Sequence, residues 1–391
     1  MPARVSPDDD PLKALLLPFD SGVLPWPAQG RVLFLRARDG WPLRRHPTGQ
    51  LLCEQGFKPL ADGLQAAGLA VQPGIGEADD APLVLVLPPR QRDEARALLA
   101  RAVGLAAPGA RVVAAVANDE GARSRERDLQ QLAGLDGTLT KFHCRVFWTP
   151  PLSGASDAAL LAQWRQADAP RDILGGRYRS RPGVFAWDRI DPASALLAGC
   201  LADDGACRSA LQGETAATLD AGAEEAGHDV GSPARRAPTV KLAGRGADLG
   251  AGWGYLAGEV LARSPQVTAL DLYEAEARAL DLARGNLAPH AGRAALSFHW
   301  HDVTAGLAQG GYDFIVSNPP FHAHDRGDRP ELGQRFIEVA AQSLRPGGRL
   351  LLVANRHLPY EATLARAFAT QRVLAEGGGF KAIEAVKAGR G

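Results

Sequence analysis

Short apolar runs alternate with helical periodicity through the second half of the chain. Residues 246–264 predict a strand, a glycine loop and a helix, and residues 266–287 predict a strand followed by a helix. Two further strands are predicted at residues 294–303 and 312–320, and residues 331–356 predict a helix, a Pro-Gly-Gly turn and a strand. This order is typical of a doubly wound, mostly parallel α/β sheet, which binds ligands beyond the carboxyl ends of its strands.

The same order of elements occurs earlier in the chain. Leu83–Asn118 repeats Phe314–Asn355 as strand, Pro-Pro, helix, Pro-Gly, strand and Ala-Asn. A duplicated fold explains both segments most simply. We therefore predict two tandem Rossmann-like domains.

A weaker overlay extends the duplication upstream. It places residues 30–43 on residues 244–256 by matching Trp41 to Trp253. The pairs set opposite each other by the two overlays are Arg36 and Asp248, Arg38 and Gly250, Pro42 and Gly254, Leu87 and Asn318, and Arg90 and Phe321. The N-terminal copy is thus predicted to be degenerate, with the scaffold kept and the chemistry lost.

Length and composition are consistent with two domains. The chain has 391 residues, with 44 basic and 44 acidic side chains, so no overall charge draws it towards nucleic acid or an anionic membrane. Residues 206–246 are small, polar and glycine-rich without apolar periodicity, which predicts an insertion. The predicted division is 1–165 for the degenerate domain, 166–205 for a linker and capping segment, 206–246 for the insertion and 247–391 for the catalytic domain.

Several common classes of protein are disfavoured. The four cysteines have no CxxC spacing, which favours reduced thiols in a cytoplasmic protein. The N-terminus is acidic where a signal peptide would be basic, and no apolar run reaches the ~18 residues of a membrane span. His322, His324 and His357 lack the carboxylate or cysteine spacing of a metal site, so no metal is expected.

A glycine-rich loop follows the first strand of the second copy. In "DLGAGWG", Gly250, Gly252 and Gly254 can let a ligand approach the backbone. A tight strand-to-helix turn is the alternative. Asp248, just before the first glycine, favours a ligand with a cationic amine, because a pyrophosphate would gain nothing from a carboxylate there.

Acidic residues end the next two strands. Glu274 lies at a strand end, where a carboxylate can accept from both ribose hydroxyls, and we prefer it to Asp271, which lies inside the apolar run. Asp302 ends the third strand and could accept from an adenine amine. A helix N-cap is an equally simple role for Asp302.

These motifs together resemble a class I S-adenosylmethionine-dependent methyltransferase that modifies amines. "DLGAGWG", the strand-end acid, "HD" and above all "NPPF" carry this resemblance, and Pro182–Leu197, Val353–Leu364 and "FKAIEAVK" resemble more narrowly the bacterial small-subunit rRNA guanine-N2 methyltransferases and their large-subunit relatives. The resemblance implies an S-adenosylmethionine cofactor, a degenerate N-terminal domain and a 16S rRNA substrate of the guanine-1207 type. It also implies that Asp191 lies near the methionine end of the cofactor, although this chain has "DPAS" where the family usually has Asp-x-Gly-Ser.

The "NPPF" motif suits methyl transfer to an aryl amine, a poor nucleophile because its lone pair is delocalised. Asn318 offers a side-chain carbonyl and Pro319 a main-chain carbonyl, which can hold the two N–H groups while Pro320 restricts the backbone. Phe321 would stack on the extruded base, returning ~1–3 kcal/mol of the unstacking cost. A simple strand-terminating turn is the alternative.

Other acceptors use the same logic. They are a guanine of 23S rRNA, the N6 amine of adenine and the N5 amide of a protein glutamine. Adenine enzymes usually have Tyr in the fourth position, and a glutamine enzyme would carry a different N-terminal domain. A non-catalytic RNA-binding factor is disfavoured because the glycines and the asparagine of the second copy are intact.

Two basic and aromatic stretches suit RNA contact. Residues 171–189 carry Arg177, Arg179 and Arg181 among aromatic side chains, and residues 141–148 begin with Lys141. Solvated arginines on a linker and a buried strand are the alternatives. The expected partner is rRNA or the small ribosomal subunit, without a membrane, and the protein is expected to be a monomer.

Overall fold

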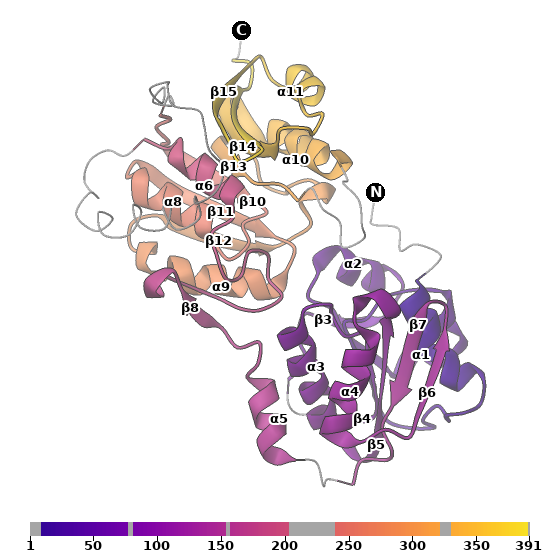
Figure 1. Cartoon of the computed structure of the whole chain (residues 1–391). Coiled ribbons are helices and arrows are strands. Elements are labelled where there is room, and N and C mark those ends of the chain that lie inside the picture. The colour runs from indigo at the N-terminus through magenta and orange to yellow at the C-terminus, as the bar shows by residue number, and fades with distance from the viewer. Residues whose placement is uncertain (1–8, 77–80, 154–156, 203–238, 321–329, 390–391) are drawn as a thin grey trace, which may run out of the picture. The chain divides into compact units, whose positions relative to one another are not determined.

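The computed structural model describes residues 9–76, 81–153, 157–202, 239–320 and 330–389. The chain divides into two compact units. The first comprises Met1–Asp188 together with Ala275–Ala279, and the second comprises Arg189–Glu274 and Leu280–Gly391. Each unit has its own sheet, with helices packed on both faces (Figure 1).

The first unit is built around a seven-stranded sheet and ends in a short hairpin. Its elements are α1 (Asp10–Asp20), β1 (Val32–Leu35), β2 (Leu51–Glu54), α2 (Lys58–Ala66), β3 (Ala70–Gln72), β4 (Ala81–Val86), α3 (Arg92–Leu105), β5 (Ala106–Ala117), α4 (Ala122–Ala133), β6 (Gly137–Lys141), β7 (Cys144–Trp148), α5 (Ala158–Arg165), β8 (Arg171–Ile173) and β9 (Tyr178–Ser180).

The second unit repeats this arrangement. Its elements are α6 (Pro192–Gly199), β10 (Gly244–Leu249), α8 (Tyr255–Arg263), β11 (Val267–Glu274), α9 (Ala277–Leu287), β12 (Ala295–Trp300), β13 (Tyr312–Ser317), α10 (Pro330–Ser343), β14 (Leu344–Asn355), α11 (Glu361–Ala367), β15 (Thr370–Gly377) and β16 (Phe380–Val386). The first three residues of α9 belong to the first unit.

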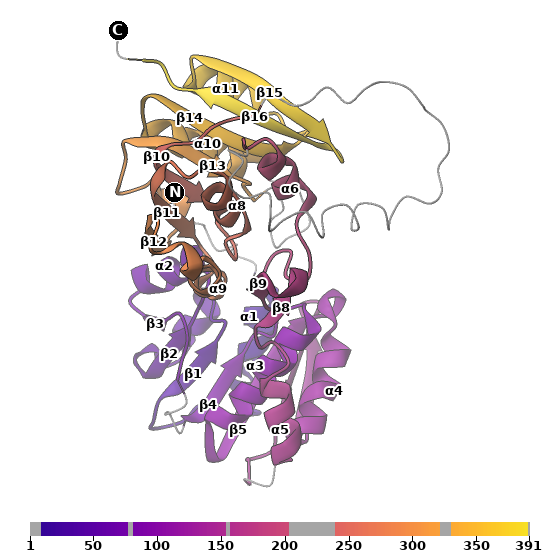
Figure 2. The ribbon, with the colours of Figure 1, turned by 90° about the vertical axis from the view of Figure 1, so that its left-hand side faces the viewer.

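Both sheets have the same topology. The strand orders are β3-β2-β1-β4-β5-β7-β6 and β12-β11-β10-β13-β14-β16-β15. In each sheet the first five strands of the order pair in parallel. The last two strands, β7 and β6 in the first sheet and β16 and β15 in the second (Figure 2), are joined by antiparallel pairing. The predicted pair of Rossmann-like, mostly parallel sheets is confirmed.

The apolar runs form strands because both faces of each sheet are covered. Successive residues of β1 alternate between two cores: Val32 and Phe34 pack on the side of α1, whereas Leu33 and Leu35 pack on the side of α3 and α4. In the second unit the two cores involve α6, α8 and α9 on one face and α10 and α11 on the other. Burial on both faces explains why these strands read as continuous apolar runs.

Strand register corrects the upstream overlay. The pairing of β4 with β5 is irregular between Ala81 and Leu83, and that of β13 with β14 is irregular between Tyr312 and Phe314. Leu83 is therefore equivalent to Phe314. Through the neighbouring strands β1 and β10, Phe34 then takes the place of Asp248, and Arg36 takes the place of Gly250. Matching Trp41 to Trp253 was wrong by two residues.

Other sequence expectations concern segments and cysteines. The end of the predicted insertion at residue 246 overlaps β10, which begins at Gly244, and residues 203–238 lie outside the described residues. The strand β15 and the helix α11 were not predicted from the sequence pattern. Cys53, Cys144 and Cys200 are buried free thiols. No helix in the described part of the chain is long and apolar enough to cross a membrane.

Candidate active site

The loop between β10 and α8 lies at the carboxyl edge of the second sheet. Gly250, Gly252 and Gly254 have φ angles of 77°, 55° and 89°, a region that favours glycine. A Cβ atom added to Gly252 would meet no atom within 4 Å, whereas one added to Gly254 would meet Ala283 of α9 at 3.2 Å. The loop therefore packs closely where α8 begins and is open at Gly252.

Glu274 ends β11 beside this loop. Its Oε2 atom accepts a hydrogen bond of 2.8 Å from the backbone N–H of Gly252. Because β10 and β11 are adjacent parallel strands, the carboxylate and the open glycine share one edge of the sheet. The fold thus brings the strand-end acid and the glycine loop together.

Asp248 is a buried carboxylate near the end of β10. Its side chain is 1% exposed, and neither carboxylate oxygen has a hydrogen-bond partner among the described residues. Burial raises the pKa of Asp248 to about 8, and the neighbouring carboxylate of Glu274 adds to the rise. The backbone amide of Ala257, which makes no well-aligned hydrogen bond to Asp248, opposes the rise only in part. A buried acceptor pair of this kind fits a ligand that carries donors or positive charge.

The raised pKa of Asp248 predicts a pH-dependent stability. The folded state keeps a proton that the unfolded state releases from about pH 4 upwards, so the contribution of this proton to stability is lost as pH rises to about 8. We expect Asp248→Asn to lack this pH-dependent loss of stability. The melting temperature of the variant minus that of the native protein, both without cofactor, should therefore increase by a few degrees between pH 5 and pH 8. One carboxylate changes stability by at most about 1.4 kcal/mol per pH unit. A constant difference across that range, measured by calorimetry, would contradict the assignment.

Asn318 directly follows β13, the neighbour of β10 on its other side. Its Nδ2 atom donates to Asp191 Oδ2 at 2.8 Å and to Ser194 Oγ at 2.9 Å. A carboxylate can only accept, so this contact fixes which end of the amide carries the hydrogens. The carbonyl oxygen, Oδ1, is buried and has no partner among the described residues. Asn318 is thus held as a hydrogen-bond acceptor.

Asp191 and Ser194 belong to the start of α6. Asp191 is the N-cap, and its Oδ2 atom accepts from the backbone N–H of Ser194 at 2.8 Å. The "DPAS" segment therefore forms a cap and a holder for Asn318 at once. Asp191 was predicted to lie near the cofactor, whereas Ser194 had no predicted role, although the serine of the "DPAS" segment is the signal that could have identified it.

The Asp191 contact gives a prediction. Asp191→Ala removes one of the two acceptors that orient Asn318, so we expect kcat to fall about tenfold while the Kd for cofactor stays within about twofold. The matched control is Asp157→Ala, which removes the N-cap of α5 through the same type of contact and should cost only ~1 kcal/mol of stability. Weakened cofactor binding by Asp191→Ala, measured by calorimetry, would instead favour direct contact between Asp191 and the cofactor.

Two other acidic residues that were predicted to bind the cofactor are hydrogen-bonded to groups of the protein. Asp271 is buried within β11, where its Oδ2 atom accepts from Arg245 and from the Tyr312 hydroxyl, both at 2.6 Å. Asp302 caps a short 3-10 turn and accepts from the backbone N–H of Thr304 at 2.9 Å. Asp271 is therefore not included in the proposed site, and the contacts of Asp302 are those of a helix N-cap.

The rest of the "NPPF" motif is partly described. Pro319 is buried and Pro320 is exposed. Ser317, the last residue of β13, donates its hydroxyl to the Leu249 carbonyl at 2.7 Å and ties the ends of β13 and β10 together. Phe321 lies outside the described residues, so its stacking role stays a prediction.

The predicted RNA-binding residues have different surroundings. Arg181 is paired with Asp168 at 2.6 Å and is not free for a phosphate. Arg179 is an exposed partner of Asp172 at 3.4 Å, and Arg177 lies over the Tyr178 ring. The positive charges of Arg179 and Arg181 in the first basic stretch are thus partly neutralised by aspartates. Lys141 is exposed at the end of β6 and lies over the Phe142 ring.

Comparisons with known proteins agree on a methyltransferase. The family model described as "Methyltransferase small domain" matches residues 229–384. "Ribosomal RNA small subunit methyltransferase C" from Salmonella newport is 27% identical over 300 residues, which are 76% of this chain and 73% of that protein. The protein of the same name from Pectobacterium atrosepticum is 27% identical over 334 residues, 85% of this chain and 81% of that protein.

A solved structure is similar over almost the whole chain. The T. thermophilus 16S rRNA N2 G1207 methyltransferase, in complex with AdoMet and guanosine, covers 99% of this chain and 93% of its own with a TM-score of 0.70. Its sequence is 22% identical, so the likeness is one of fold. The similarity extends over both sheets.

Proposed function

Since the chain belongs to the S-adenosylmethionine-dependent rRNA guanine-N2 methyltransferase family, we propose that it methylates the exocyclic N2 amine of a guanine in 16S rRNA. The observation that carries the proposal is the buried carbonyl of Asn318, held as an acceptor by Asp191 and Ser194. An acceptor of fixed direction is what a weakly nucleophilic amine needs. The relatives named for the small ribosomal subunit favour 16S over 23S rRNA.

The cofactor supplies an electrophilic methyl group on a sulfonium. We propose that the open backbone at Gly252 and the carboxylates of Glu274 and Asp248 hold it. The unpartnered oxygens of Asp248 and the space beside Gly252 fit a ligand with donors and a positive charge. Glu274 would accept from ribose hydroxyls, as acids at this strand end commonly do.

The residues of this chain would act mainly by orientation. Asn318 accepts one N–H of the guanine amine and the carbonyl of Pro319 accepts the other, so that the nitrogen lone pair is aimed at the methyl carbon. After methylation, the amine would lose its extra proton to solvent. No general base is required, because the amine becomes acidic once methylated. Orientation of this kind can supply several kcal/mol of barrier lowering.

The first unit is proposed to position RNA and to stabilise the protein. The register places Phe34 and Arg36 where the second unit has Asp248 and Gly250, which argues against a second cofactor site. We assign RNA contact to the exposed side chains Arg177, Arg179 and Lys141. The protein is proposed to act in the cytoplasm as a monomer.

In vitro methylation tests this function. Purified protein and radiolabelled S-adenosylmethionine are incubated with 30S subunits, naked 16S rRNA, 50S subunits and a glutamine-containing peptide. We expect label in N2-methylguanosine from one 16S substrate and background label elsewhere. Label in N6-methyladenosine, in 50S subunits or in the peptide would replace the proposal with the corresponding alternative.

A further inference from the structure

A short segment of the chain that follows Glu274 belongs to the first unit. Ala275–Ala279 is grouped there by its contacts, although its flanking residues belong to the second unit. Its backbone forms an antiparallel bridge between Glu276 and Phe57. Lys58 N–H donates to the Ala275 carbonyl at 2.8 Å, and Ala277 N–H donates to the Gly56 carbonyl at 2.9 Å. The bridge is thus formed just beyond the end of β2.

The side chain of Arg278 extends this attachment. Its guanidinium contacts Glu94 at 2.9 Å, Asp168 at 3.7 Å and Glu276 at 3.0 Å. The Glu94 and Asp168 side chains are only 8% and 13% exposed. Burial lowers the pKa of Arg278, but Glu94 and Glu276 together raise it above its usual value. A charge-paired arginine at a largely buried position is fixed in one arrangement.

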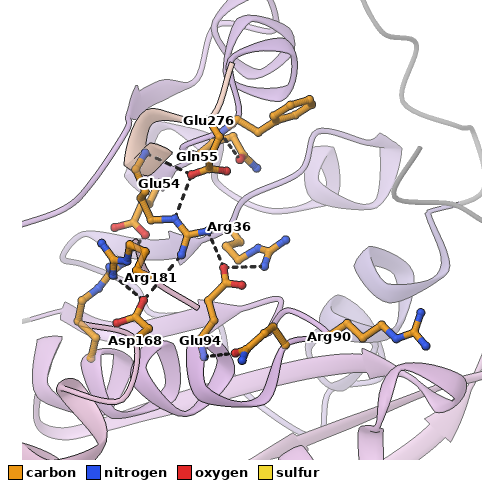
Figure 3. Close-up of polar contacts among 12 residues, drawn as sticks. Arg36, Glu54, Gln55, Arg90, Glu94, Asp168, Arg181 and Glu276 are labelled. Atoms are coloured by element: carbon orange, nitrogen blue, oxygen red, sulfur yellow. Dashed lines mark hydrogen bonds and ion pairs between the residues drawn. The ribbon is translucent and has the colours of Figure 1, made fainter. Parts of the chain in front are cut away.

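Two further arginines complete this charge cluster. Arg36 contacts the same Glu94 oxygen at 3.3 Å, and Arg181 contacts Asp168 at 2.6 Å. Figure 3 shows Arg36 and Glu94 directed towards each other, with Arg181 beside Asp168 and Glu276 nearby. With Arg278 and Glu276 included, the cluster contains three arginines and three carboxylates. The cluster is balanced, so loss of one member leaves an uncompensated charge in a poorly solvated place.

The cluster occupies the carboxyl edge of the first sheet. Arg36 directly follows β1 with a φ of 55°, the left-handed conformation that its equivalent Gly250 has in the second unit. Gln55 directly follows β2, at the position equivalent to Glu274. Its amide donates to the Ala37 carbonyl at 2.7 Å and accepts from Phe57 N–H at 2.9 Å. The edge that would hold a cofactor in an active copy is filled by protein groups.

We propose that this edge of the degenerate copy is a receptor for Ala275–Ala279, and that Arg278 is a positioning residue that sets cofactor affinity in the active copy. Glu274 is joined by a peptide bond to Ala275 and accepts from Gly252 N–H. Holding the segment therefore restricts the carboxylate proposed to bind the ribose. The inference rests on the proposed role of Glu274, and it gives the inactive copy a function independent of RNA.

The coupling should appear in binding and not in chemistry. A loosened segment must be ordered again when the cofactor binds, and this cost weakens affinity. The ion-pair partners of Arg278 among the described residues are not groups that we assign to methyl transfer. Arg278→Met should therefore weaken the Kd for S-adenosylmethionine by about tenfold, within the usual range of coupling between sites. It should raise the KM for cofactor equally and leave kcat at saturating cofactor within about twofold.

Calorimetric titration of the full-length protein with S-adenosylmethionine tests the inference. Glu94→Gln removes the partner on α3 and should weaken binding in the same direction. Arg278→Lys should give an intermediate Kd, because the guanidinium contacts its carboxylates through different nitrogens of a planar fork and lysine keeps the charge but has a single nitrogen. The controls are Arg284→Met, a half-exposed arginine further along α9, and Asp93→Asn, the neighbour of Glu94 that pairs with Arg171. Both controls should bind like the native protein.

The outcomes separate this inference from the proposed function. Native protein that binds no S-adenosylmethionine would overturn the proposed function. Native protein that binds it, with Arg278→Met and Glu94→Gln binding equally well, would overturn the inference alone. Should Arg278→Met fail to fold, the comparison of Arg278→Lys and Glu94→Gln with their controls decides. A fall in kcat at unchanged Kd would also overturn the positioning role.

Discussion

Replacement of Asn318 by Ala is expected to abolish methyl transfer while cofactor binding stays unchanged. The side-chain carbonyl of Asn318 is buried and has no hydrogen-bond partner among the described residues. Losing one fixed hydrogen-bonding group that acts in the transition state lowers kcat by about 10²–10³-fold. We assign Asn318 to the amine and not to the cofactor, so the Kd for S-adenosylmethionine should change less than about twofold.

Asn355→Ala is the matched control for this variant. Asn355 also ends a strand of the same sheet, and its side chain accepts only from the His357 backbone among the contacts described. Its loss should leave kcat within about twofold. If Asn318→Ala reduced cofactor affinity in parallel with turnover, Asn318 would be part of the cofactor site and the proposed mechanism would be wrong.

Gly252→Arg is expected to eliminate cofactor binding. The space beside Gly252 is open in the protein, and the substitution would fill it with a long cationic side chain next to Glu274. We expect the Kd for S-adenosylmethionine to weaken by at least about 100-fold, or ~2.7 kcal/mol. A small loss of stability is also expected, because φ is 55° at this position.

Gly285→Arg controls for the bulk and charge of the new side chain. Gly285 lies on an exposed position of α9, and an added Cβ atom there also meets nothing within 4 Å. This variant should bind cofactor like the native protein. Cofactor binding by a folded Gly252→Arg protein, with folding checked by its melting temperature, would show that the ligand does not approach this loop.

The fold could be predicted because its strands carry two independent signals. Strands buried on both faces read as continuous apolar runs, and the duplicated segments beginning at Leu83 and Phe314 carry the same turn residues. The antiparallel edge strand β15 was harder to identify. Its pattern is mostly exposed, with only Leu374 buried, so no apolar run marked it.

The overlay on tryptophan failed for a physical reason. Trp253 is 4% exposed within the glycine loop, whereas Trp41 is 75% exposed. The two rings are in different environments and were matched only by letter. Strand register, which depends on pairing with β4 and β13, shows the correct equivalence of Arg36 with Gly250.

Sequence reasoning identified single site residues but not their contacts. The motif around Asn318 was recognised, yet its partner Asp191 lies 127 residues away in the chain, and spacing carries no information over that distance. Asp271 was a lesser candidate because it is an acid within the apolar run that Glu274 ends. Only the fold reveals that Arg245 and Tyr312 already occupy it.

Mass spectrometry of rRNA nucleosides tests the central claim most directly. Ribosomal RNA from a strain lacking this gene is compared with that of its parent, and the modified positions are mapped on nuclease fragments. We expect one N2-methylguanosine to be missing from 16S rRNA and to return when the native gene, but not the Asn318→Ala variant, is supplied. Unchanged N2-methylguanosine in 16S rRNA, or loss of a mark from 23S rRNA instead, would contradict the account.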